Sequence, residues 1–215
     1  MEPCRCADDY ARMFGRSTAA GDAKRFRRRG LRGSAADLAE GIEDIGVDGG
    51  SILEVGGGVG GLTVHLLEHG AASAVNVELS PGYESEAARL LADRDLADRV
   101  ERRIGDFVTS DGLEPVDVVA LHRVVCCYPD WRAMLDRAAD TATRTIGLTF
   151  PRDWWPGRAA VTVGNGFCRL SGTQFRAFVH PADDMLAFLA RQGFEVRTDA
   201  VGLVWRTVVL ARALH

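Results

Sequence analysis

Residues 51–67 read SILEVGGGVGGLTVHLL, and this stretch decides the fold class of the chain. Ile52, Leu53 and Val55 form an apolar run short enough for a buried strand, and an apolar segment with helical spacing begins after five glycines. The stretch therefore predicts a strand, a tight turn and a helix. Glycines let the backbone turn sharply and approach a ligand, while a helix N-terminus offers unpaired N–H donors and positive potential. We expect a ligand with negative charge or hydrogen-bond acceptors at this turn.

The glycine spacing fits the GxGxxG pattern of dinucleotide-binding sites at Gly56, Gly58 and Gly61. Glu78 follows at about the distance expected of a carboxylate that binds a ribose. Taken alone, this match leaves a nicotinamide-dependent reductase open as a function.

A longer match favours another cofactor. Residues 54–60, EVGGGVG, resemble motif I, (D/E)xGxGxG, of the class I S-adenosylmethionine (SAM) dependent methyltransferases. The resemblance implies that Glu54 ends the first strand beside the methionine part of SAM. It also implies that the motif glycines border the cofactor; these are Gly56, Gly58 and Gly60.

The second and third strands of the expected sheet supply further cofactor residues. Residues 74–78 form a short apolar strand that ends in Glu78, whose carboxylate can accept both hydroxyls of a ribose. The alternative is an acid that caps the next helix. Leu79 is assigned to the same site. Asp106 and Phe107 follow the third strand, where the resemblance implies contact of an acid with the adenine amino group and of an apolar side chain with the ring.

The continuous apolar run at 116–121 is typical of a central parallel strand that is covered on both faces. The segment after it, 121–131, resembles the motif IV region of small-molecule methyltransferases, which borders the transferred methyl group. We therefore place three residues here, with His122 in the cofactor site and as a candidate general base, and Arg123 and Tyr128 in the substrate site. A role of His122 in shaping the loop is equally open.

Residues 151–180 are expected to form a substrate lid, because paired tryptophans offer a large apolar contact area. Packing of this insert onto the body is the alternative. His180 is the second candidate base. The candidate substrate residues of the lid and of the N-terminal segment are Tyr10, Phe14, Trp154 and Trp155.

Composition limits the class of protein. A chain of 215 residues with 47% hydrophobic and 26% charged residues fits one globular domain. It has no apolar run of membrane-spanning length, and its first ten residues, MEPCRCADDY, lack the pattern of a signal peptide. We expect a cytoplasmic protein with no membrane partner and with reduced cysteines. Adjacent Cys126 and Cys127 match no zinc spacing, and no metal site is expected.

Charge is unevenly distributed. Residues 1–33 hold nine basic and four acidic side chains, whereas the other residues hold 17 basic and 26 acidic ones. A run of basic residues at 24–32 could bind an anionic substrate or nucleic acid, but a solvated helix face packed against the acidic body is favoured. The single lysine and the abundance of arginine and alanine suggest a bacterial source.

These patterns together predict an α/β fold with a Rossmann-like, seven-stranded, mostly parallel sheet, an antiparallel last strand and helices on both faces. Residues 1–33 form an N-terminal helical cap and residues 34–215 the SAM-binding domain. Helices are expected at 34–46, with Ser34 as N-cap, and at 60–69, 82–97, 130–142 and 183–192; strands are expected at 51–55, 74–78, 100–104, 116–121, 145–150, 194–197 and 203–210.

The implied function is transfer of the SAM methyl group to an O, N, S or C atom of a small molecule, which leaves S-adenosylhomocysteine (SAH). Three alternatives stay open: cleavage or cyclisation of SAM itself, or its sensing by a regulator; a nicotinamide-dependent reductase; and methylation of RNA, which the acidic body disfavours. A homodimer stays open as the oligomeric state.

Overall fold

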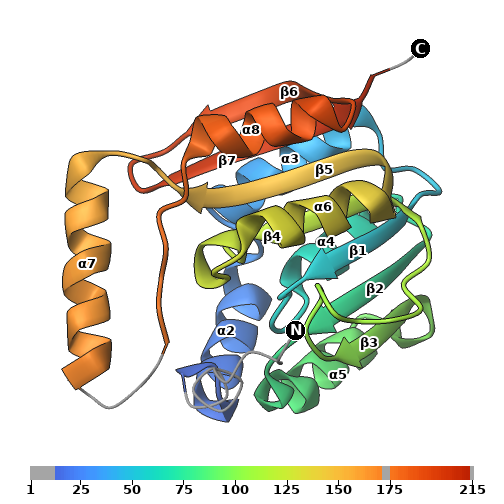
Figure 1. Ribbon diagram of the computed structural model, residues 1–215. Coiled ribbons are helices and arrows are strands. Elements are labelled where there is room, and N and C mark those ends of the chain that lie inside the picture. The colour runs from blue at the N-terminus through green and yellow to red at the C-terminus, as the bar shows by residue number, and fades with distance from the viewer. Residues whose placement is uncertain (1–12, 171–174, 214–215) are drawn as a thin grey trace.

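A computed structural model describes residues 13–170 and 175–213 (Figure 1). Its centre is a seven-stranded sheet in the order β3-β2-β1-β4-β5-β7-β6. The first five strands pair in parallel, and β7 lies antiparallel between β5 and β6. The strands are β1 (Ser51–Val55), β2 (Ser73–Glu78), β3 (Val100–Ile104), β4 (Val116–His122), β5 (Ala142–Pro151), β6 (Phe194–Val201) and β7 (Trp205–Arg212). The predicted sheet is confirmed.

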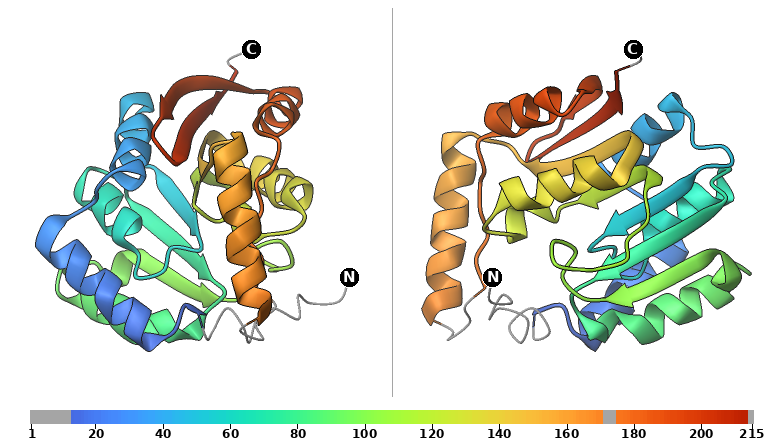
Figure 2. Two further views of the ribbon diagram at one scale, coloured as in Figure 1. Left: turned by 90° about the vertical axis from the view of Figure 1, so that its left-hand side faces the viewer. Right: turned by 45° about the vertical axis from the view of Figure 1, so that its right-hand side comes forward.

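Helices cover both faces of the sheet. One face carries α2 (Arg16–Arg29), α3 (Ser34–Ile45), α4 (Gly61–Glu68) and α5 (Glu84–Ala92), and the other carries α6 (Trp131–Thr141) and α8 (Ala182–Arg191). Helix α7 (Trp155–Leu170) stands apart beyond the end of β5 (Figure 2). Short 3-10 turns are η1 (Pro81–Tyr83), η2 (Ala97–Arg99) and η3 (Val125–Cys127).

Strand β4 shows why a continuous apolar run marks the centre of such a sheet. Val119 and Leu121 are buried in the layer beneath α6 and α8. Val118 and Ala120 are buried in the layer beneath α3 and α4. Because successive side chains of a strand point to opposite faces, a strand between two helical layers needs apolar residues at every position.

Three local predictions need correction. Helix α3 begins at Ser34 with Gly33 as N-cap, so Ser34 is not the cap, and its hydroxyl contacts His122 and Arg123 instead. The helix expected at 82–97 is divided into η1, α5 and η2. The lid segment contains α7, a helix that was not predicted.

Within the described ranges, no helix combines the length and the apolar character that a membrane crossing needs.

Candidate functional site

The turn after β1 is formed mainly by glycines, so its backbone is not covered by side chains. Gly56 has φ 63° and Gly58 has φ 56°, conformations that favour glycine. A Cβ on Gly56 would lie 2.7 Å from Cγ2 of Val124, closer than such atoms pack. The turn therefore requires glycine at this position for both its conformation and the space around it.

Glu78 holds this turn from the end of β2. Its Oε2 accepts a hydrogen bond from the Gly58 amide at 2.8 Å, and its Oε1 accepts one from the Ser80 amide at 2.9 Å. Burial raises the pKa of Glu78, although the amides of Ser80 and Gly58 oppose the rise. Each carboxylate oxygen has two acceptor sites, so Glu78 retains capacity to accept hydrogen bonds from a ligand.

Glu54 anchors the start of α4. Its Oε2 accepts hydrogen bonds from the Thr63 amide at 3.2 Å, the Thr63 hydroxyl at 2.5 Å and the Asn76 side chain at 3.1 Å. The side chain is fully buried, and this burial raises its pKa from 4.5 to about 7. Arg102 supports the same turn from β3, where it bonds the Gly58 carbonyl at 3.1 Å and pairs with Glu84.

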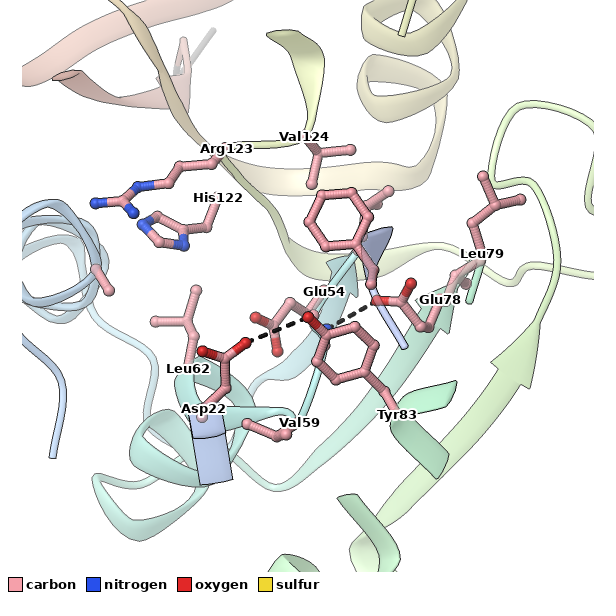
Figure 3. A pocket seen from close by; sticks show the side chains of 18 of the residues that line it. Asp22, Glu54, Val59, Leu62, Glu78, Leu79, Tyr83, His122, Arg123 and Val124 are labelled. Carbon is pink, nitrogen blue, oxygen red and sulfur yellow. Dashed lines mark hydrogen bonds between the residues drawn. The ribbon is translucent and has the colours of Figure 1, made fainter. Parts of the chain in front are cut away.

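A cavity of about 460 Å³ opens above the turn (Figure 3). Its volume suits a small organic ligand or cofactor. The predicted site residues that line it are Phe14, Glu54, Gly56, Gly58, Glu78, Leu79, Asp106, Phe107, His122, Arg123 and Tyr128. The carboxyl ends of β1, β2 and β4 bring these residues together, at the edge where open α/β sheets bind ligands.

Helix α2 covers part of this cavity. Asp22, Arg25 and Phe26 line it, and Asp22 accepts a hydrogen bond from the Tyr83 hydroxyl at 3.2 Å (Figure 3). The Ser80 hydroxyl donates to the Phe14 carbonyl at 2.7 Å. The N-terminal segment is thus attached to the loop that follows Glu78, which makes it a wall of the cavity.

His122 and Arg123 form another wall. The Ser34 hydroxyl lies 3.1 Å from His122 Nε2 and accepts from Arg123 Nη2 at 2.9 Å. Burial, with the nearby Arg123 guanidinium, lowers the pKa of His122 from 6.5 to about 4. The lowered pKa makes this imidazole a weaker proton acceptor than a free one, and a role of His122 as a base stays a prediction.

Arg123 has φ 59°, a conformation uncommon outside glycine. Its guanidinium lies 4.4 Å from the centre of the Trp205 ring, a cation–π contact with β7. Arg25 and Arg32 line the same cavity, and the pKa of Arg123 is lowered mainly by burial and to a lesser extent by the charge of Arg25. The cavity therefore contains a cluster of three cationic side chains: Arg25, Arg32 and Arg123.

Asp106 already accepts hydrogen bonds from two other residues of the protein. It accepts hydrogen bonds from the Val108 amide at 2.9 Å and from the Tyr128 hydroxyl at 3.1 Å. Burial and the Asp106 carboxylate raise the pKa of Tyr128. Phe107 is buried and presents part of its surface to the cavity.

Comparison with known proteins adds to this geometry. Residues 53–144 match the family described as "Methyltransferase domain". This part of the chain, somewhat less than half of its length, is similar to that family. The matched residues run from the glycine turn through β4 to β5, so they include most of the cavity lining. No curated protein sequence matches the chain.

Solved methyltransferases share the fold across nearly the whole chain. Magnesium protoporphyrin IX methyltransferase from Synechocystis PCC 6803, with bound SAH, is 20% identical at a TM-score of 0.70, over 95% of this chain and 97% of that one. A putative methyltransferase in complex with the Trm112 activator of Haloferax volcanii is 13% identical, with a TM-score of 0.69 over 98% of both chains. A putative RNA methyltransferase from Pyrococcus horikoshii is 14% identical, with a TM-score of 0.63 over 84% of this chain and 85% of that one.

His180 lies outside the cavity lining. Its Nε2 is within hydrogen-bond distance of the Val125 carbonyl at 3.1 Å and the Tyr128 carbonyl at 3.0 Å. An Nε2–H donor satisfies both, so His180 holds the loop after β4 in place. The Phe178 ring stacks on it, and the Phe178 amide donates to the Cys126 carbonyl at 2.7 Å. This geometry supports a positioning role for His180, and its role as a base stays a prediction.

The adjacent cysteines lie in η3, with 3.8 Å between their sulfur atoms. Cys127 lines the cavity, whereas Cys126 is buried behind it. The hydrogen bond with the neighbouring Cys127 thiol, together with burial, raises the pKa of Cys126, so this thiol is protonated near neutral pH.

Three other predicted residues do not meet the cavity. Gly60 supports the turn with φ 78° but does not line it. Trp154 and Trp155 lie at the start of α7, and Trp155 is 80% exposed. A substrate role for the tryptophans stays a prediction. Tyr10 lies outside the described residues.

Several lining residues were missed from the sequence. Tyr83, Asp22 and Arg25 reach the cavity because α2 packs across η1, a long-range contact with no local pattern. One sequence signal was available. Arg102 is a charged residue within a strand, and in the fold its side chain is nearly buried and binds the carbonyl of Gly58 in the turn.

Proposed function

We propose that this chain is a SAM-dependent methyltransferase that acts on a small molecule and releases SAH. The observation that carries the proposal is one cavity in which the bare glycine turn, the Glu78 carboxylate and the Asp106–Phe107 pair meet. The turn has no room for a Cβ at Gly56, and Glu78 keeps free acceptor sites. Both features fit a cofactor with a ribose and an adenine. Solved neighbours with SAH bound support the same choice.

Each part of the cavity has a role in holding SAM. Glu78 would accept hydrogen bonds from the ribose hydroxyls, while Phe107 and Leu79 would contact the adenine ring and Asp106 would accept from its amino group. The turn amides near Gly56 and Gly58 would face the cofactor's polar groups. When bound, SAM supplies an electrophilic methyl group on a sulfonium. The protein's contribution is to orient this group towards an acceptor.

The acceptor would lie beside His122 and Arg123. Because the pKa of His122 is about 4, it contributes little as a base at neutral pH. Catalysis then depends on positioning and on exclusion of water by α2, with the arginine cluster balancing negative charge on the acceptor. An acceptor that is already nucleophilic, such as a carboxylate, requires no proton removal by the protein.

An RNA substrate is the second candidate, because a similar solved structure is described as a putative RNA methyltransferase. The basic run at the end of α2 would be its contact surface. Arg27 of this run pairs with Glu86 and Asp93, and Arg25 pairs with Asp22. These ion pairs reduce the free positive charge, and residues of α2 form a wall of the cavity, so both features favour a small molecule.

Calorimetric titration with SAH, with NADH as a parallel ligand, tests the cofactor. We expect micromolar binding of SAH that weakens at least tenfold in Glu78→Ala, because two charge-assisted hydrogen bonds are lost. The variant is expected to remain folded by circular dichroism. Glu101→Ala, which removes an exposed carboxylate from β3, is the control and should bind normally. Binding of NADH without SAH would overturn the proposal.

Mass spectrometry of products then tests the reaction. SAH together with a methylated acceptor supports methyl transfer. Methylthioadenosine would indicate attack on the aminocarboxypropyl carbon, and therefore a different SAM chemistry.

A further inference from the structure

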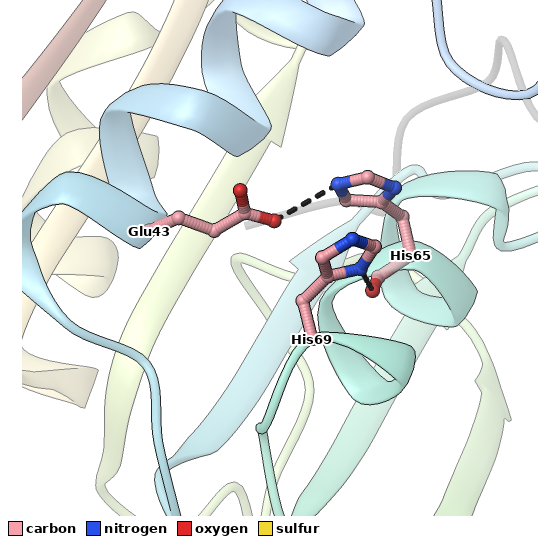
Figure 4. A group of neighbouring side chains, drawn as sticks. All are labelled: Glu43, His65 and His69. Atoms are coloured by element: carbon pink, nitrogen blue, oxygen red, sulfur yellow. Dashed lines mark hydrogen bonds and ion pairs between the residues drawn. The ribbon is translucent and has the colours of Figure 1, made fainter.

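A second cluster of ligating side chains lies away from the cavity, between α3 and α4 (Figure 4). Glu43 lies near the end of α3, His65 lies on α4, and His69 is the C-cap residue of α4. The two histidines are four residues apart, so they share one face of the helix. Their rings stack with centroids 4.0 Å apart. None of the three lines the cavity.

The ligand atoms of the three side chains converge. His65 Nε2 lies 2.9 Å from Glu43 Oε1, and one ligand atom from each residue lies within 4.8 Å of the others. Glu43 Oε1 is buried, and its approach to His65 lacks the geometry of a hydrogen bond, so this oxygen has no hydrogen-bond partner among the described residues. A buried carboxylate oxygen without a donor is costly unless something else neutralises it.

The ring of His69 is oriented for ligation. Its Nδ1 lies 2.7 Å from the carbonyl oxygen of His65, so Nδ1 carries the proton and donates it. Nε2 is then the unprotonated nitrogen, and Figure 4 shows it directed towards Glu43 and His65. Metal-binding histidines commonly donate the other ring N–H to a backbone carbonyl in this way. His69 is exposed, so a metal ion can reach the cluster from solvent.

We propose that Glu43, His65 and His69 form a zinc site with three protein ligands and a water molecule in the fourth position. Two imidazoles and a carboxylate are a ligand set that Zn²⁺ uses, with bonds of about 2.0–2.1 Å. In a tetrahedral site such bonds separate the ligand atoms by about 3.3 Å. The observed separations range from 2.9 Å to no more than 4.8 Å and so include this value.

A zinc ion at this position would join α3 to α4. Helix α3 carries Ser34, which contacts His122 and Arg123 at the cavity, and α4 begins at the glycine turn. The ion would therefore stabilise the packing of the two helices whose N-termini border the main cavity, without contributing a group to it.

Titration of the untagged, chelator-treated full chain with Zn²⁺ tests the proposal. We expect one equivalent to bind with an affinity that Glu43→Gln, His65→Ala and His69→Ala each weaken at least tenfold. The matched control is Glu40→Gln, an exposed carboxylate one turn earlier on α3, which should bind as the unaltered chain does. Equal affinity and stoichiometry in the control and in all three variants would overturn the site.

Two further readouts separate this site from the cysteines. Zn²⁺ at 100 times the dissociation constant should raise the Tm by roughly 5 to 10 °C, and the rise should be lost in His69→Ala. Co²⁺ in the site should show the visible bands of a tetrahedral nitrogen and oxygen site without the near-ultraviolet band of thiolate ligation. A thiolate band that persists in His65→Ala would assign the metal to cysteine and overturn the proposal.

Discussion

Two buried carboxylates, those of Glu54 and Glu78, hold the glycine turn and the start of α4 in place by hydrogen bonds. Glu54 and Glu78 stand at the ends of neighbouring strands, and each accepts hydrogen bonds from the backbone of the turn or of the helix that follows it. The two differ in burial and in partners. Glu54 accepts from Thr63 and Asn76 through Oε2, whereas Glu78 accepts one backbone amide on each oxygen. Both side chains line the cavity.

The raised pKa of Glu54 predicts how stability depends on pH. The folded-state pKa, about 7, lies above the usual value of 4.5, so the folded state binds the proton more tightly than the unfolded state. Stability from this group is complete below about 4.5 and is lost as the pH rises through about 7. We expect Glu54 to lower the free energy of unfolding by roughly 2 to 3 kcal/mol between pH 5 and pH 8.

Urea denaturation at pH 5 and pH 8 measures this loss. Glu54→Gln retains an acceptor for Thr63 but has no proton to lose, so its free energy of unfolding should fall less over the same interval. Glu40→Gln serves as the control and should follow the unaltered chain. Identical pH dependence in Glu54→Gln and the control would contradict the assignment.

Replacing His122 and replacing His180 should have different effects. His122→Ala should lower turnover at least tenfold while SAH affinity changes little, because His122 borders the acceptor side of the cavity. His180→Ala should lower the Tm, since two loop carbonyls lose their donor. If the chain has the proposed activity, its pH–rate profile should show no inflection from His122 near 6.5, because the pKa of His122 is about 4. A normal turnover in His122→Ala would remove it from the site.

Among the elements, α2 is the one whose position determines access to the cavity. Phe26 packs against Gly61 at the start of α4, where a Cβ on Gly61 would lie 3.0 Å from the Phe26 ring. Arg27 adds ion pairs to Glu86 and Asp93 on the α5 side. The apolar face of α2 packs on the body, whereas its basic residues at 24–29 are exposed, and Arg25 and Arg32 also border the cavity.

Phe26→Ala should release α2 from the body. Loss of a buried phenylalanine side chain costs about 3 kcal/mol or more, which is comparable with the local stability of one docked helix. We expect faster amide hydrogen exchange in α2 and weaker SAH binding. Phe167→Ala removes the same side chain from the exposed face of α7 and should change neither quantity. Unchanged exchange in α2 would show that Phe26 does not hold the helix.

At the scale of the whole molecule, the cavity joins segments distant in sequence, from Phe14 to Met134. A ligand that fills it contacts α2, the glycine turn and the loop after β4 at once. Its binding free energy therefore adds to global stability. We expect SAH at 100 times its dissociation constant to raise the Tm by roughly 5 to 10 °C, measured by differential scanning calorimetry. NADH at the same concentration should give no shift, and a rise with NADH alone would contradict the cofactor assignment.

The sequence by itself determined the sheet, because the pattern that encodes it is local. Apolar runs at 51–55 and 116–121, glycines that no other residue can replace and acids at strand ends all act within one strand–turn–helix unit. The parallel order then follows from packing rules that connect successive units. The same locality allowed Glu78, Asp106 and His122 to be assigned to one edge of the sheet, and the fold brings them to one cavity.

Only the tertiary structure decided what surrounds those residues. The low pKa of His122, the removal of His180 from the cavity and the entry of Asp22 and Tyr83 all depend on contacts between segments far apart in the chain. The same is true of Glu43, which meets His65 and His69 only after α3 packs beside α4. Burial and long-range pairing set these properties, and neither is written in the spacing of neighbouring residues.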